Sequence, residues 1–93
     1  RLLFANFGEQ EALHCLKLLR QVREAGIAAE LYPDQAKLPK QFTYAEKKGI
    51  PFVVIVGENE MNEGVVTLKK MGAQEKGRAM PIAEMIALLK DQS

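Results

Sequence analysis

Three glutamates lie between two apolar runs of this sequence, and two lysines end the second run. Glu58, Glu60 and Glu63 occupy a polar segment, and Lys69 and Lys70 close the apolar run that follows. Carboxylates accept hydrogen bonds and ammonium groups donate them, so the set can recognise a ligand that offers both donors and acceptors. Glu58 and Glu60 could also act as an acid and a base, but no apolar pocket is at hand to divide those roles. We therefore expect a recognition surface and not a catalytic site.

The other reactive residue types do not form a catalytic or metal-binding set. His14 and Cys15 are the only histidine and cysteine, and as neighbours on a helix they point to different faces. With no second histidine and no cysteine pair, a metal site is not expected, and His14 is expected at the surface. Cys15 is predicted to be a small core residue. Gly57 and Gly64 belong to neither of the glycine patterns that bind phosphate.

Composition predicts one small, soluble domain. The chain has 93 residues, of which 47% are hydrophobic and 27% charged, and its formal net charge is +1. A charge so near zero argues against binding nucleic acid by bulk electrostatics. The positive charge is uneven, because Lys37, Lys40, Lys47 and Lys48 gather in or beside one expected helix. A solvated helix face and a charged loop would explain these charges without any ligand.

Targeting features of the sequence are few. No apolar run approaches the length of a membrane span, and the first residues do not resemble a signal peptide. A single cysteine cannot form an internal disulfide, which fits a reducing cytosol. Together these features lead us to expect a cytoplasmic protein. Because the sequence starts with Arg1 and not with Met, we also expect a fragment of a longer protein.

Hydrophobic periodicity and turn residues predict alternating strands and helices. Strands are expected over residues 1–7, 28–32, 52–56, 65–70 and 78–80, and helices over 9–25, 38–48 and from Pro81 onward. In the first helix the apolar stripe is Ala12, Cys15, Leu16, Leu19 and Val22, and in the last it is Ile82, Met85, Ile86 and Leu89. Glu58–Gly64 is expected to be a polar turn between two antiparallel strands, and Gly72–Gly77 a loop.

The order of these elements predicts the fold class. A start of strand, helix, strand, helix, strand requires right-handed parallel crossovers, and the hairpin then adds antiparallel edge strands. The apolar run Ile50–Gly57 is typical of a strand that is buried on both faces of a helix-covered sheet. We therefore predict an α/β protein, a three-layer α/β/α arrangement with a five-stranded mixed sheet in the order 2-1-3-4-5.

A set of consecutive motifs resembles a known family. The motifs are LLRQVREAGIAAELY, KLPKQFTYAEKKG, GIPFVVIVGENE and EGVVTLKKM. In this order they resemble the C-terminal anticodon-binding domain of class II aminoacyl-tRNA synthetases, and most closely that of histidyl-tRNA synthetase. The resemblance can be followed from Asn6 to about Leu89, so it covers nearly the whole chain as a single domain of the same three-layer fold.

The resemblance implies which residues would meet RNA. In this family the second glutamate of the GE-x-E turn and the end of the following strand face the anticodon, and those positions are Glu60 and Lys69 here. Unpaired bases expose their edges, where a carboxylate suits the N1–H and N2 amino donors of guanine and an ammonium suits carbonyl or phosphate oxygens. Glu58, Lys70 and Gln35, which stands in the turn before the second helix, are expected to add contacts. The alternative is an exposed Glu60–Lys69 salt bridge, worth less than about 1 kcal/mol.

Two positions depart from the family pattern. Lys70 stands where an acidic residue often follows the lysine of the strand, and this makes the end of the strand more basic. The loop MGAQEKG lacks the usual glycine–glutamate–glutamine pattern, so no contact is assigned to Gln74 or Glu75.

By the same resemblance, the domain would bind tRNA, perform no chemistry and hold no cofactor. The full-length enzyme, a cytoplasmic homodimer, would use ATP and Mg²⁺ to attach histidine to its tRNA, and would bind neither DNA nor a membrane. Histidine codons are complementary to the anticodon GUG, whose two guanines offer donors to Glu60. The alternatives are the same domain from a prolyl-, glycyl- or threonyl-tRNA synthetase, a synthetase-derived regulatory or protein-interaction module, and, more distantly, an unrelated small-molecule-binding α/β domain.

Overall fold

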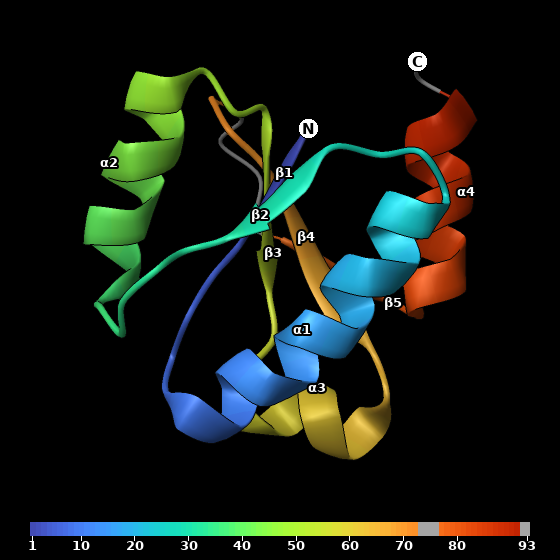
Figure 1. Ribbon diagram of the computed structural model, residues 1–93, viewed down its shortest axis with the longest axis horizontal. Helices are drawn as coiled ribbons and strands as arrows, with labels where there is room; N and C mark the ends of the chain where they lie inside the picture. Colours follow the sequence, from blue (N-terminus) through green and yellow to red (C-terminus); the bar gives the residue numbers. More distant parts are fainter. Residues whose placement is uncertain (73–76, 92–93) are drawn as a thin grey trace.

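Short strands alternate with helices in the computed structural model, which describes residues 1–72 and 77–91 (Figure 1). The elements in chain order are β1 (Leu2–Phe4), α1 (Glu9–Glu24), β2 (Ala29–Leu31), α2 (Leu38–Lys48), β3 (Phe52–Ile55), α3 (Glu58–Glu63), β4 (Val66–Lys70), β5 (Arg78–Met80) and α4 (Ile82–Asp91). The strands form one sheet in the order β2-β1-β3-β4-β5. β1 is parallel to β2 and β3, whereas β4 is antiparallel to both β3 and β5. The predicted fold class and strand order are thus confirmed.

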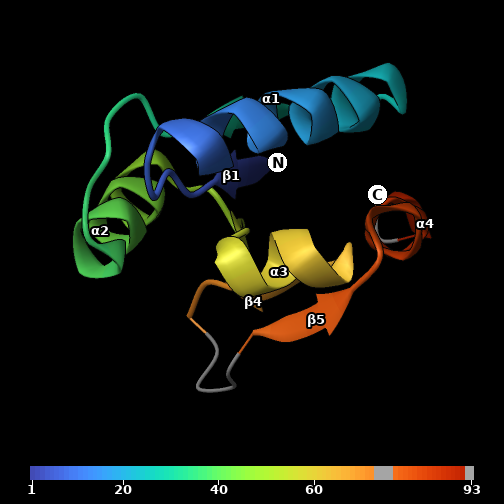
Figure 2. The same cartoon turned by 90° about the horizontal axis from the view of Figure 1, so that it is seen from below.

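The sheet separates two apolar clusters, and the alternation of side chains along each strand assigns residues to one or the other. Leu2, Phe4 and Val54 belong to the larger cluster, which also contains the buried residues of α1 and α4. Leu3 and Val53 belong to the second cluster, against which α2 packs. Figure 2 shows the result, with α2 on one side of the sheet and α1, α3 and α4 on the other. Both faces of β1 and β3 are therefore covered, as the apolar run Ile50–Gly57 predicts.

The end of α2 is set by glycine chemistry. Gly49 has a φ of 69°, a left-handed conformation that favours glycine because it has no Cβ. The amide of the next residue, Ile50, donates a hydrogen bond of 2.8 Å to the carbonyl of Ala45. Ile50 is itself buried, so the same turn that ends the helix also anchors the start of β3 in the second cluster.

The prediction of a plain turn over Glu58–Gly64 is wrong, because this segment forms the short helix α3. The backbone amide of Gly57 donates a 2.7 Å hydrogen bond to Oε1 of Glu60, three residues ahead, and this contact fixes the first turn. Carboxylates in a first turn are also stabilised by the helix dipole. Gly64, with a φ of 70°, ends the helix. Met61 packs against the larger cluster, which holds α3 on the side of the sheet that carries α1.

The apolar face of α1 departs from the predicted one, and Ala12, expected on it, is only half-buried. Leu16 is 49% exposed, and Leu18 takes the place in the core that was expected for it. His14, expected at the surface, is half-buried. The buried stripe follows positions three and four apart, which is the periodicity of a single helix face: Cys15, Leu18, Leu19 and Val22. Leu16 lies one position off this stripe and therefore faces outward.

The remaining elements agree with expectation apart from their ends. α2 and β5 have the predicted bounds, whereas β1 and β2 are shorter than predicted. Met85 and Leu89 of α4 are buried, and Ile82 and Ile86 pack against the same cluster, as predicted. The loop expected over Gly72–Gly77 lies mostly outside the described residues, as do Gln74 and Glu75. No helix in the described ranges is both long and apolar enough to cross a membrane.

Candidate nucleic-acid interface

Glu60 has a structural partner. Its Oε1 accepts the Gly57 amide, and since glycine has no side chain, this is only the glutamate half of a capping box. The side chain of Glu60 is half-buried. A carboxylate has about four lone-pair sites, so one structural hydrogen bond leaves acceptor capacity for a ligand. A base that bound to Glu60 would meet a carboxylate already fixed in orientation.

Lys69 extends from β4 on the face of the sheet that carries α2. It stands opposite Val53 in the β3–β4 ladder, and residues opposite each other in a ladder share a face. Its Nζ lies 5.8 Å from the centroid of the Phe42 ring of α2, within the range of a cation–π interaction. Lys69 is half-buried, so its side chain contacts the ring and is still partly accessible to solvent.

Lys70 lies on the opposite face from Lys69. It stands opposite Phe52, which packs against the larger cluster, and its side chain is exposed. Adjacent residues of a strand point to opposite faces, so a ligand that docks on one face of the sheet cannot contact both lysines there.

Glu60 and Lys69 start from separate places. Thr67 stands opposite Ile55, the last residue of β3, and Lys69 lies two positions further along β4, about 7 Å away at the usual rise of a strand. α3 also packs on the other side of the sheet from Lys69. A ligand that touched both residues would therefore have to be extended, as an RNA loop is.

Gln35 and Glu58 lie at the carboxyl edge of the parallel strands. Glu58 is the first residue of α3 and is exposed. Gln35 follows β2, is exposed, and has its Cδ and Oε1 3.8 Å from the point where a Cβ on Gly8 would stand. Thus Gln35, Glu58 and Glu60 lie at the carboxyl ends of the parallel strands, whereas Lys69 projects from one face of the sheet and Lys70 from the other.

A buried pair of amide side chains shapes the turn that carries Gln35, and sequence reasoning missed it. Gln41 is 0% exposed, and its Nε2 donates to the carbonyls of Asn6 (2.9 Å) and Ala36 (2.7 Å). Its Oε1 accepts from the Asn6 amide (2.7 Å). Nδ2 of Asn6 in turn donates to the carbonyl of Tyr32 (3.0 Å). The two side chains therefore hold both ends of the segment between β2 and α2.

The sequence contains a signal for this network. Gln41 stands at the inward-facing position one turn before Ala45 in α2, where an apolar residue is expected. A buried amide side chain must find partners, because an unpaired one costs about 1–3 kcal/mol. Sequence alone does not say which distant backbone groups supply them.

The sulfur of Cys15 is shielded from solvent, as predicted for a core residue. Its side chain is buried and lies 4.0 Å from the carbonyl of Ala5. Burial, with a smaller contribution from the negative charge of Glu11, raises the pKa of the Cys15 thiol from 9.0 to about 12. The thiol is therefore protonated at neutral pH and is a poor nucleophile. Within residues 1–72 and 77–91, no three His, Cys, Asp or Glu side chains are grouped as metal ligands.

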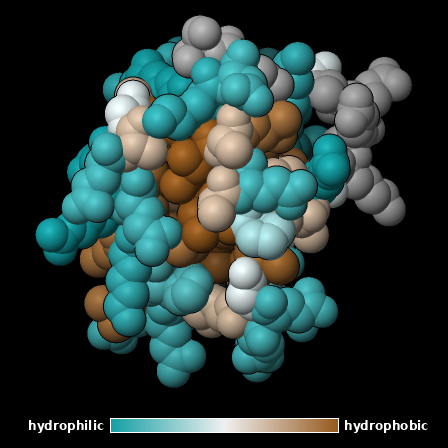
Figure 3. Space-filling view, turned by 90° about the vertical axis from the view of Figure 1, so that its right-hand side faces the viewer, coloured by the Kyte–Doolittle hydropathy of each residue, from teal (hydrophilic) through white to brown (hydrophobic). Residues whose placement is uncertain are grey.

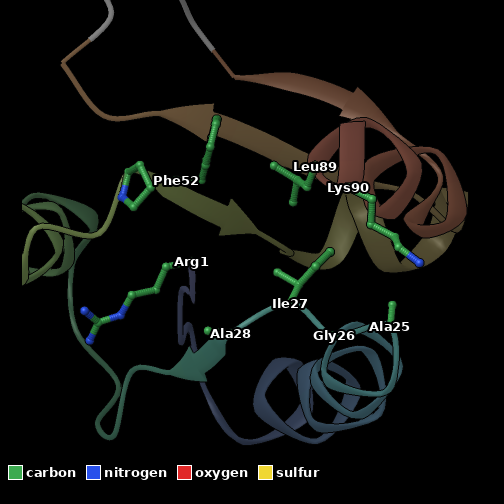
Figure 4. Close-up of a pocket in the computed structure, with 9 residues that line it drawn as sticks. Arg1, Ala25, Gly26, Ile27, Ala28, Phe52, Leu89 and Lys90 are labelled. Atoms are coloured by element: carbon green, nitrogen blue, oxygen red, sulfur yellow. The ribbon is translucent and has the colours of Figure 1, made fainter. Parts of the chain in front are cut away.

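A cavity of about 400 Å³ lies at the opposite edge of the sheet, where α1 ends and β2 begins. Ile27 and Leu89 project toward its interior, whereas the charged ends of Arg1 and Lys90 point away from it (Figure 4). Apolar surface also lies in a hollow on the side that α1 and α4 occupy (Figure 3). Small-molecule sites combine apolar walls with a few convergent polar groups. The charged side chains here do not converge, so this cavity is not the candidate site.

Comparison with known proteins identifies the family. The model of the anticodon binding domain family matches residues 4–92. The chain is 56% identical over 89 residues to a histidine–tRNA ligase of Phocaeicola vulgatus, a match that covers 96% of this chain and 19% of that protein. It is 57% identical over 76 residues to a histidine–tRNA ligase of Bacteroides fragilis, covering 82% of this chain and 17% of that protein. The chain thus spans about a fifth of the length of these relatives.

Solved structures share the fold. The histidyl-tRNA synthetase from Nostoc sp. PCC 7120 superposes with a TM-score of 0.90 at 27% identity, covering 98% of this chain and 22% of that one. The RNA binding domain of a threonyl-tRNA synthetase from Cryptosporidium parvum also superposes with a TM-score of 0.90, but at 14% identity, over 98% of this chain and 23% of that one. The latter likeness is one of fold alone. Because the family model matches nearly the whole chain, the chain belongs to the family of anticodon-binding domains.

Proposed function

We propose that this chain recognises the anticodon loop of a histidine tRNA, as the anticodon-binding part of a histidine–tRNA ligase. The observation that carries the proposal is the 56% identity, over almost the whole chain, with a histidine–tRNA ligase. The fold by itself does not distinguish among synthetases, because the threonyl domain superposes as well as the histidyl one. Sequence identity therefore favours the histidine enzyme over its prolyl, glycyl and threonyl counterparts.

The site chemistry is compatible with reading an unpaired RNA loop. Lys69 offers a cation on a sheet face, and Glu60, Glu58 and Gln35 offer acceptors and an amide at the neighbouring edge. Guanine carries the donors that a carboxylate accepts, and the anticodon GUG contains two guanines. In this proposal Glu60 reads a guanine, Lys69 contacts a base carbonyl or a phosphate, and Gln35 and Glu58 add peripheral contacts. Lys70, on the other face of β4, adds only long-range attraction.

The rest of the reaction would take place elsewhere in the enzyme. The relatives extend far beyond the matched segment, which is 19% of the protein from Phocaeicola vulgatus. We assign ATP, Mg²⁺ and histidine to that remaining length, together with the contacts of a cytoplasmic homodimer. The chain itself would hold the anticodon loop so that the acceptor end of the tRNA meets the catalytic part.

A binding titration tests the proposal. The chain should bind a stem-loop RNA with the anticodon GUG more tightly than stem-loops whose anticodon bases are exchanged, as measured by fluorescence anisotropy. Affinity should fall with added salt only in proportion to the few phosphates that are neutralised. A chain that is folded by circular dichroism yet binds no stem-loop at low salt would contradict the proposal. Equal affinity for all anticodons would instead indicate a module that kept the fold and lost tRNA reading.

A further inference from the structure

Two lysine–aromatic pairs lie on opposite sides of α2. Lys69 Nζ lies 5.8 Å from the centroid of Phe42, and Lys48 Nζ lies 5.7 Å from the centroid of Tyr44. Phe42 and Tyr44 are two residues apart on the helix, so their side chains point in nearly opposite directions around it. The geometry of the two pairs is almost equal, but their surroundings differ.

On the Tyr44 side, the aromatic ring is surrounded by other side chains of the chain. The Tyr44 hydroxyl donates to Oε2 of Glu30 at 3.3 Å, and Arg1 pairs with Glu30 at 3.6 Å. The Tyr44 ring also packs edge-on against Tyr32, with 5.1 Å between ring centroids. Arg1 offsets the charge of Glu30, and the Tyr44 ring is already engaged in packing beside the edge strand β2.

The Phe42 side borders a stretch of sheet that no described helix covers. α2 packs over Leu3, Ala5 and Val53, and β4 and β5 lie beyond it (Figure 2). On this face Thr67 is half-buried and Ala79, which stands opposite it, is exposed. Both side chains are small, and among the described residues this part of the sheet is less covered than the part beneath α2, where Leu3, Ala5 and Val53 are fully buried.

We propose that Phe42 is a positioning residue for RNA binding, whose ring holds the Lys69 ammonium over the face of β4 and β5 beyond α2, where the RNA loop docks. This inference rests on the proposed function. A lysine side chain loses rotamer freedom when it binds, and a ring that helps to order it beforehand removes part of that cost. Phe42 therefore raises affinity without touching the RNA, and Lys69 makes the contact.

Positioning and direct contact give different results in a double-mutant cycle. Lys69→Met, which keeps the apolar stem and removes the charge, should weaken binding of the GUG stem-loop about tenfold and lower the salt slope by about one. Phe42→Leu should weaken binding about threefold, as expected for the loss of one cation–π contact, and leave the salt slope unchanged. The double variant should bind like Lys69→Met alone. Phe42→Tyr should bind like wild type.

Matched controls come from the other pair on the same helix. Tyr44→Leu and Lys48→Met remove the equivalent partners and should change affinity by less than about twofold, because that side does not face the RNA. Tyr44→Leu also controls for general loosening of α2. In the free protein, ring-current shifts of the Lys69 side-chain protons in NMR spectra should disappear in Phe42→Leu. If that variant does not fold, Phe42→Met, whose longer and more flexible side chain adapts to an irregular gap, replaces it.

The outcomes separate this inference from the proposed function. Wild type that binds no stem-loop overturns both. Binding that Phe42→Leu leaves unchanged, or a loss of equal size from Tyr44→Leu, overturns the positioning role alone. Losses that add in the double variant also overturn it, because they would mean that Phe42 contacts the RNA independently of Lys69. Non-additive losses with an intact salt slope in Phe42→Leu support it.

Discussion

At the scale of single residues, Glu60 combines a structural contact with a proposed contact to RNA. Its carboxylate accepts the Gly57 amide at 2.7 Å and so fixes the start of α3. Both glutamate and glutamine can serve at this position of a helix start. Glu60→Gln therefore keeps the cap and alters only the acceptor pattern that a base would meet, whereas Glu60→Ala removes both.

Glu60→Gln should separate the two contacts. Because glutamine presents one acceptor and one donor where glutamate presents two acceptors, binding of the GUG stem-loop should weaken by about 1–3 kcal/mol. Unfolding by urea should show a change in stability below about 0.5 kcal/mol. With inosine in place of the contacted guanine, wild type and variant should bind with similar affinity, because inosine lacks the N2 amino group. Zero coupling at every anticodon position would remove Glu60 from the site.

Cys15 makes stability depend on pH in the alkaline range. The thiol has a pKa of about 12 in the folded chain and 9.0 as its ordinary value, so above pH 9 the unfolded chain releases a proton that the folded chain keeps. Its contribution to stability is complete below pH 9 and is lost as the pH rises, by about 1.4 kcal/mol per pH unit. Urea unfolding of wild type and Cys15→Val at pH 7.5 and pH 10 measures the difference. Parallel losses in both chains would contradict it.

At the scale of elements, β2 and β5 are the edges of the sheet, and each depends on a contact that sequence periodicity does not reveal. Edge strands present backbone groups without a strand partner. On β2, the guanidinium of Arg23 donates from Nε (3.0 Å) and Nη2 (2.8 Å) to the carbonyl of Ala29. At the start of β5, Gly77 lies so close to β4 that a Cβ would stand 2.5 Å from Cγ2 of Thr67.

Arg23→Ala should destabilise the fold by about 1–2 kcal/mol, since it removes two charge-assisted hydrogen bonds to one carbonyl. Arg20→Ala is the matched control on the same helix. Arg20 pairs with Glu24 at 3.1 Å, but both side chains are largely exposed, so its loss should cost less than about 0.5 kcal/mol. Urea unfolding compares the two variants. Equal losses would mean that the Ala29 carbonyl finds an equivalent partner in water.

Gly77→Ala should destabilise the fold by about 1–3 kcal/mol, because the added methyl group meets the Thr67 methyl group. Thr67→Ser removes that methyl group, so the double variant Gly77→Ala/Thr67→Ser should recover most of the loss relative to Thr67→Ser alone. Thermal unfolding of the four chains gives the coupling. A loss that persists in the serine background would instead assign it to the Leu68 carbonyl, which would lie 3.4 Å from the new Cβ.

At the scale of the whole molecule, the sheet decides which charges can act together. The net charge is only +1, so attraction to RNA depends on where cations gather. Lys69 shares the face of α2, and Lys70 lies on the face of the larger cluster. An RNA loop that docks beside α2 would contact one lysine and meet only the long-range field of the other.

Lys69→Ala should therefore weaken binding of the GUG stem-loop more than Lys70→Ala, and only Lys69→Ala should lower the salt slope by about one. Anisotropy titrations at several salt concentrations provide both quantities. Equal losses with equal changes in slope would mean that both lysines act as diffuse phosphate contacts. The opposite order would place the RNA on the side of α1 and α4.

Much of the fold could be predicted from sequence because local rules specify it. The bounds of α2 follow from its apolar spacing and from Gly49, and the strand order follows from crossover handedness. The candidate site was less predictable. α3 was expected as a turn, since six helical residues are too few for a periodic signal, and their helix depends on one side-chain cap and on Met61 packing.

Apart from α3, the kinds of element and their order could be predicted from the sequence, as could the lysine and glutamates available for recognition, since these depend on neighbours along the chain. Which residues meet depends on how distant segments pack. This packing places Leu18 and not Leu16 in the core, pairs Gln41 with Asn6, and brings Phe42 beneath the ammonium of Lys69. Each of these outcomes depends on strand register and helix rotation, which packing between distant segments fixes.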